Sequence, residues 1–100
     1  MRRKARVDAN HAEITEALRR CGWTVLDTSR LGSGFPDLLA AKHGRIELIE
    51  VKDGRKVLSQ QKPTPAEQKV ADVLAGAGVT VRYVNCMAHV LALSQEGAIR

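Results

Sequence analysis

Residues 34–52 are the part of the sequence that most constrains the fold. Asp37, Glu50 and Lys52 stand there among positions of which half are Leu, Ile, Val or Ala. Burying a charged side chain costs free energy unless that side chain is paired or binds a ligand. Any fold for this chain therefore has to give these three groups a partner or a task.

The same residues are expected to form a β-hairpin. Asp37 and Glu50 are about equally far from its turn, and cross-strand neighbours in a hairpin lie close together. We therefore expect both carboxylates at one edge of a sheet, with Lys52 beside them. The expected strands are residues 37–41 and 46–52, joined by a turn at residues 42–45.

The second strand of this hairpin carries apolar residues on both faces, which predicts a central strand covered on both sides. Ile49 and Val51 would line one face. The other face would hold Ile46, Leu48, Glu50 and Lys52. Glu47 would face away from Glu50 as an ordinary surface residue.

A first helix is predicted for residues 7–21, where apolar residues recur at helical spacing. At 100° per residue, Glu16 lies almost opposite the apolar stripe, where a solvated charge belongs. Glu13 lies on the flank of that stripe. If the helix packs on a sheet, Glu13 can reach the edge of the sheet and Glu16 cannot.

A second helix begins at a capping box formed by Thr64 and Glu67, with Pro65 at the first helical position. Its expected apolar stripe is Ala66, Val70, Val73, Leu74 and Ala77. Further strands are expected at residues 23–27 and 79–84, and a short last helix at residues 87–93. The order is then helix, three strands, helix, strand, which is an α/β arrangement.

One hundred residues form one small domain with little core to spare. We expect a basic arm at residues 1–6, a single domain at residues 7–94 and a tail at residues 95–100. There is neither a membrane-spanning apolar run nor a signal peptide, so a cytoplasmic protein is expected. The two cysteines, Cys21 and Cys86, are expected to be reduced and partly buried.

The net charge of +5 favours an anionic partner, for which nucleic acid is the simplest choice, although a basic protein without such a partner would have the same composition. With one Trp, one Phe and one Tyr, the chain lacks a stacking platform for single strands. The arm and the basic loop at residues 53–62 are candidate phosphate contacts, and a solvated tail is the alternative for the arm. The candidates are Arg2, Arg3, Lys4, Arg6, Arg55, Lys56 and Lys62.

Residues 32–34, Gly-Ser-Gly, match neither a Walker loop nor a dinucleotide-binding motif. Two interpretations stay open. The segment is a flexible turn, or its small residues let a phosphate backbone come close to Asp37, which makes Ser33 a further candidate contact.

Two carboxylates with room for water suit Mg²⁺, which takes hard oxygen ligands and few of them from protein. The backbone carbonyl of Val51 is a natural third ligand beside Asp37 and Glu50. A metal held in this way activates water for phosphodiester hydrolysis. Neighbouring carboxylates raise the pKa of Lys52, which favours a cation that orients the attacking water over a general base. A surface salt bridge is the alternative for the three residues.

Together these motifs resemble the PD-(D/E)xK nuclease signature. Gly34-x-Pro36-Asp37 is followed, after a hairpin, by Glu50-Val51-Lys52, and a helix with an acid precedes both. Within that superfamily, residues 8–84 are similar to the small stand-alone VRR-NUC domains of bacteria and their phages. The similarity also covers Asp8-Ala9-Asn10, Asp53-Gly54 and the helix start at residues 64–67.

The resemblance implies a restriction-endonuclease-like αβββαβ core, a four-stranded mixed central sheet flanked by helices. It implies Asp37 and Glu50 as metal ligands for Mg²⁺ (Mn²⁺ as substitute), Lys52 as the catalytic lysine and Glu13 as the helix acid. One departure is Glu67, which stands where the family often has a glutamine, with Gln68 next, so the role of that glutamine is open here.

The resemblance also implies an endonuclease acting on branched DNA such as four-way junctions, working as a homodimer like the junction resolvases of DNA repair. Two symmetric cuts need two symmetric sites, which gives the dimer a physical reason. The alternative from another class is a non-catalytic nucleic-acid-binding protein that keeps the fold. A plain protein-interaction domain would leave the acids unexplained.

Overall fold

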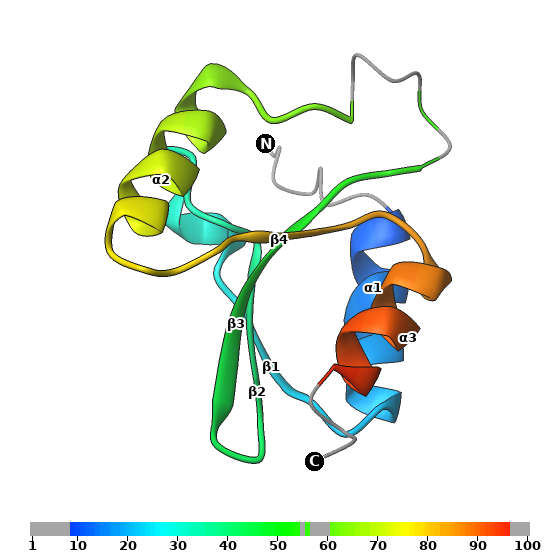
Figure 1. Ribbon diagram of the computed structural model, residues 1–100. Coiled ribbons are helices and arrows are strands. Elements are labelled where there is room, and N and C mark those ends of the chain that lie inside the picture. The colour runs from blue at the N-terminus through cyan, green and yellow to red at the C-terminus, as the bar shows by residue number, and fades with distance from the viewer. Residues whose placement is uncertain (1–8, 55, 57–60, 97–100) are drawn as a thin grey trace.

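A four-stranded sheet with helices on both faces forms the protein (Figure 1). The structure is a computed structural model that describes residues 9–54, 56 and 61–96. Helices α1 and α3 lie on one face of the sheet, and α2 lies at one end of the other face. The elements are α1 (Ala9–Arg20), β1 (Thr24–Asp27), the 3₁₀ helix η2 (Ser29–Leu31), β2 (Leu38–Lys42), β3 (Arg45–Val51), α2 (Pro65–Gly76), β4 (Arg82–Val84) and α3 (Met87–Gln95).

The sheet is mixed and its strands follow one another in chain order, β1-β2-β3-β4. The first three strands are antiparallel, and β4 pairs parallel to β3. The β2–β3 hairpin closes over two residues, His43 and Gly44, which both have positive φ as a type I′ turn requires. Its register pairs Leu38 with Ile49, so the next position along brings Asp37 towards Glu50 as expected.

The core lies between the sheet and helices α1 and α3. Ile14 and Leu18 of α1 and Val90 of α3 are buried against strand residues of the same face. These strand residues are Val25, Leu38, Ala40, Ile49 and Val84. Burying such side chains supplies roughly 1.5–3 kcal/mol each, so this side of the sheet carries most of the folding energy.

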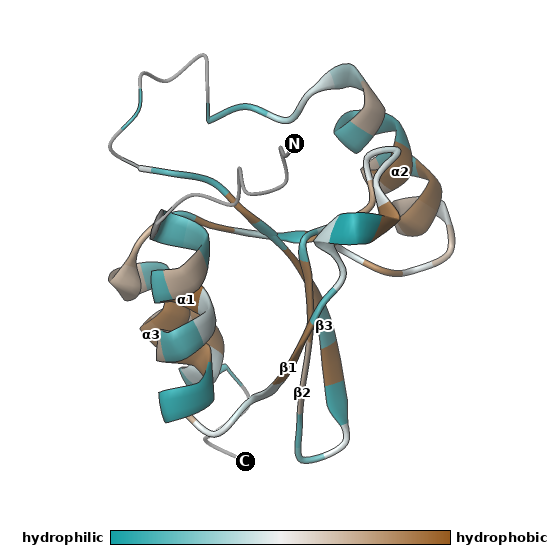
Figure 2. Cartoon of the chain, turned by 180° about the vertical axis from the view of Figure 1, so that it is seen from behind, coloured by the Kyte–Doolittle hydropathy of each residue, from teal (hydrophilic) through white to brown (hydrophobic). Residues whose placement is uncertain are grey.

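The other face of the sheet is only partly covered, which corrects the expectation for β3. Ile46 is 64% exposed and Leu26 of β1 is also exposed, while Glu50 at the far end of β3 is buried beneath α2. Within α2, Val73 is 67% exposed and the expected stripe is reduced to half-buried Val70 and Leu74. Apolar segments accordingly lie on β3 and α2 outside the core (Figure 2).

Two smaller expectations are wrong. Glu47 does face away from Glu50, but it is a half-buried partner of Arg45 (2.8 Å) and Arg82 (3.5 Å) rather than an ordinary surface residue. Cys86 is exposed, against expectation, whereas Cys21 is half-buried as expected, and both are free thiols. None of the helices in the described part of the chain is long and apolar enough to cross a membrane.

Candidate active site

Asp37 stands immediately before β2, where the loop that follows β1 fixes its main chain. The Thr28 amide donates to the Asp37 carbonyl at 2.8 Å, and the Thr28 hydroxyl donates to the carbonyl of buried Pro36 at 2.8 Å. The Asp37 carboxylate accepts a hydrogen bond from the Val51 amide at 3.0 Å, through Oδ2. This bond turns the side chain of Asp37 towards the end of β3 and leaves its second oxygen for another partner.

Glu50 lies one residue before the end of β3 and is only 4% exposed. The pKa of Glu50 is raised to about 9, first by burial and then by the negative charges of Asp37 and Glu67. A hydrogen bond with Glu67 acts in the same direction, whereas the Lys52 ammonium opposes the shift. The Glu50 carboxyl therefore keeps its proton at neutral pH unless a further positive charge binds beside it.

Three elements hold Lys52. Its amide donates to the Val84 carbonyl at 3.0 Å, and its carbonyl accepts from the Asn10 side chain at 2.6 Å. Its ammonium donates to Glu67 of α2 at 2.7 Å and lies 3.8 Å from Glu50. Burial lowers the pKa of Lys52, but the hydrogen bond to Glu67 and the surrounding carboxylates outweigh it and raise the pKa above its ordinary value. Lys52 is thus a fixed cation, as the sequence favoured.

Glu67 belongs to this cluster, although the sequence analysis did not place it there. The capping box forms as expected: the Glu67 amide donates to the Thr64 hydroxyl, and the Glu67 carboxylate accepts from the Thr64 amide at 2.9 Å. Burial raises the pKa of Glu67, but the bonds from Lys52 and Thr64 outweigh it and lower the pKa. The sequence did contain a sign that Glu67 belongs to the site, because Glu67 stands where the family often has a glutamine.

The Gly-Ser-Gly loop serves the packing of α2. At Gly34, φ is +87°, and an added Cβ would lie 2.3 Å from the Ala66 carbonyl oxygen. The small residue lets the first turn of α2 approach the loop that leads into Asp37. Ser33 is exposed and also has positive φ, 55°.

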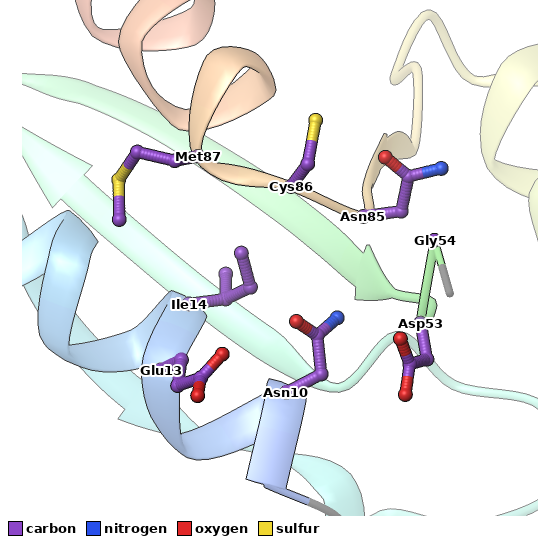
Figure 3. A pocket seen from close by; sticks show the side chains of 8 residues that line it. All are labelled: Asn10, Glu13, Ile14, Asp53, Gly54, Asn85, Cys86 and Met87. Atoms are coloured by element: carbon purple, nitrogen blue, oxygen red, sulfur yellow. The ribbon is translucent and has the colours of Figure 1, made fainter. Parts of the chain in front are cut away.

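Glu13 lies at a different place, on the side of the sheet that α1 covers. It lines a pocket of about 470 Å³ with Asn10 and Asp53, bounded by α1 and the segment between β4 and α3 (Figure 3). The remaining lining residues are Ile14, Gly54, Asn85, Cys86 and Met87. Asp37, Glu50 and Lys52 do not line this pocket, and Asn10 connects the two places through its bond to the Lys52 carbonyl.

Two of the candidate phosphate contacts, Lys56 and Lys62, are exposed. The others in the arm and the basic loop lie outside the described residues: Arg2, Arg3, Lys4, Arg6 and Arg55.

Asp37 and Glu50 fit a divalent cation as oxygen donors. The described residues contain no group of three or more His, Cys, Asp and Glu side chains arranged around a metal position. Mg²⁺ needs fewer, because it binds through one or two carboxylates and keeps several waters. Burial is the largest cause of the raised pKa of Glu50, and the negative charges of Asp37 and Glu67 add to it, so a cation beside Asp37 and Glu50 would favour the ionised carboxylate.

Comparison with known proteins agrees with this architecture. No family model and no curated protein matches the sequence. A solved structure described as "VRR_NUC domain" superposes with a TM-score of 0.69 and 24% sequence identity, covering 90% of this chain and 99% of that chain. The chain has the VRR-NUC fold. The αβββαβ order and the mixed four-stranded sheet expected from the sequence are confirmed.

In this chain Glu50 is buried where its ionisation opposes folding. Between about pH 4.5 and about pH 9 the folded carboxyl keeps a proton that the unfolded chain releases, so stability falls as pH rises. Glu50→Gln should raise the free energy of unfolding at pH 7 by on the order of 1–3 kcal/mol in metal-free buffer and flatten this pH dependence. Urea denaturation between pH 5 and pH 9 measures both effects. Equal slopes in the two proteins would contradict the expectation.

Proposed function

We propose that the protein is a Mg²⁺- or Mn²⁺-dependent endonuclease that hydrolyses phosphodiester bonds of DNA. The observation that carries the proposal is the convergence of Asp37, Glu50 and Lys52 at the ends of two neighbouring strands, with the ammonium fixed against Glu67. The alternative for these residues is a surface salt bridge, whose acid would be exposed to water. Glu50 is instead buried in the cluster. Likeness to a domain described as VRR_NUC supports the same class of activity.

Each residue has a task in that reaction. Asp37 and Glu50 would hold the cation, Asp37 through the carboxylate oxygen that the Val51 amide does not occupy, and the Val51 carbonyl is the third candidate ligand. The bound cation would supply Lewis-acid stabilisation and an activated water. Lys52 orients that water and offsets the negative charge that develops on the phosphate, because its own pKa is raised and it stays protonated. Glu13, the helix acid that the resemblance implies for this reaction, would act from the adjoining pocket.

The proposed substrate is branched DNA, including four-way junctions, and the proposed active form is a homodimer. The net charge of +5 favours a polyanion, and exposed Lys56 and Lys62 continue from the strand that carries the cluster. Symmetric cutting needs two sites, and the partly uncovered sheet face around Leu26 and Ile46 is an apolar surface that a second copy would cover.

Cleavage assays test the proposal. With Mn²⁺, the wild type should nick supercoiled plasmid or cut a synthetic four-way junction, and Asp37→Asn should reduce the rate at least about 100-fold because a cation ligand is lost. Glu16→Gln is the matched control, since Glu16 is an exposed acid of α1 paired only with Arg20 on that helix in the described contacts. If the wild type binds DNA but leaves both substrates intact, the non-catalytic alternative holds instead. Loss of binding at raised salt fits both functions.

A further inference from the structure

The Glu67 carboxylate has two tasks at the start of α2, one in the helix cap and one at the candidate active site. Its Oε1 atom accepts from the Thr64 amide at 2.9 Å and from the Lys52 ammonium at 2.7 Å. Capping alone would need only the first bond. The second bond joins α2 to the end of β3 through the side chain of Lys52.

Glu67, rather than Glu50, sets the position of the Lys52 ammonium. The distance from Nζ to Glu67 is that of a charge-assisted hydrogen bond, whereas the distance from Nζ to Glu50 is 3.8 Å. The Lys52 and Glu67 side chains are only 13% and 19% exposed, so water screens their attraction weakly.

The main chain of Lys52 is already fixed by Val84 and Asn10. A lysine side chain still has four rotatable bonds and loses much conformational entropy when it is held in one place. The bond to Glu67 supplies that restraint, and because Glu67 is itself held by Thr64, the acceptor does not move with the lysine.

We propose that Glu67 is a positioning residue, which holds the Lys52 ammonium beside Asp37 and Glu50 through a carboxylate anchored in the cap of α2. The proposal rests on the proposed nuclease function. It assigns Glu67 to the orientation of Lys52 and not to the binding of the cation.

Three variants separate positioning from capping. Glu67→Ala removes the carboxylate together with its bonds to Lys52, Thr64 and Glu50, and Glu67→Gln keeps an oxygen that accepts from Lys52 and Thr64 but removes the charge. Thr64→Ala removes only the hydroxyl that accepts from the Glu67 amide and keeps the Thr64 amide that bonds the carboxylate. It is the matched control, because it weakens the cap and leaves Lys52 held.

Glu67→Ala should lower kcat about tenfold or more in single-turnover cleavage with saturating Mn²⁺, while KM for DNA and Kd for Mn²⁺ stay within about twofold of wild type. Glu67→Gln should recover most of that loss, and Thr64→Ala should cut at the wild-type rate. A kcat for Glu67→Ala within twofold of wild type would overturn the proposal. So would an equal loss in Thr64→Ala, or a weaker Kd for Mn²⁺ that makes Glu67 a cation ligand.

A second readout does not depend on cleavage. Acetylation by a soluble N-hydroxysuccinimide ester, followed by mass spectrometry, should modify Lys52 slowly in the wild type and several-fold faster in Glu67→Ala, with no change in Thr64→Ala. Exposed Lys69 serves as the internal standard. If the wild type cuts no DNA, the proposed function fails, and these labelling rates alone decide whether Glu67 holds Lys52. Equal labelling of Lys52 in all variants would overturn the proposal.

Discussion

Gly34→Ala is expected to destabilise the protein by about 2–5 kcal/mol, a large share of the stability of a small domain. The new Cβ would lie 2.3 Å from the Ala66 carbonyl oxygen and 2.9 Å from the Glu67 amide nitrogen, both of which are backbone atoms. A φ of +87° adds strain for any residue with a side chain. Urea denaturation followed by circular dichroism measures the loss.

Gly78→Ala is the matched control for this prediction. Gly78 has nearly the same φ, +88°, but nothing lies within 4 Å of an added Cβ there. It should therefore lose only the backbone term, about 1–2 kcal/mol. Equal destabilisation of the two variants would contradict the close packing of Gly34 against α2.

Lys52→Met is expected to lower DNA cleavage at least about 100-fold, because in the proposed reaction it removes a fixed cation from beside the phosphate that is cut. Met keeps most of the length of the side chain, so the packing changes little. DNA binding should stay within a few-fold of wild type, since one phosphate contact at most is lost. Single-turnover cleavage and filter binding on the same junction measure the two quantities.

The control for Lys52→Met is Lys69→Met, which removes an equal charge from an exposed position of α2. It should cut at close to the wild-type rate. A Lys52→Met protein that remains folded and cuts as well as Lys69→Met would exclude Lys52 from catalysis.

Local patterns in the sequence were sufficient to predict the hairpin and the start of α2. Turn residues and alternating apolar residues set the register, and the register brings Asp37 towards Glu50. The capping box at Thr64 and Glu67 forms as expected for the same reason, because all of its parts lie within four residues. Features that depend only on residues close together in the sequence could thus be predicted without a structure.

Features that depend on distant packing were missed. Glu47 is half-buried because Arg82 of β4 reaches it, 35 positions along the chain, and Ile46 is exposed because α2 covers only the Glu50 end of its face. The second task of Glu67 depends on where α2 lies against β3, which the helical pattern of α2 does not specify. Helical periodicity predicts which face of a helix is apolar. Which other element packs against that face depends on the assembled fold.

The most direct test of the proposed site is a crystal structure grown with Mn²⁺ and measured at a wavelength where manganese scatters anomalously. The proposed site predicts an anomalous peak within coordination distance of carboxylate oxygens of both Asp37 and Glu50, with Lys52 still bonded to Glu67. A peak in the pocket of Glu13 and Asp53 alone, or an Asp37 carboxylate turned away from Glu50 with no peak between them, would contradict it.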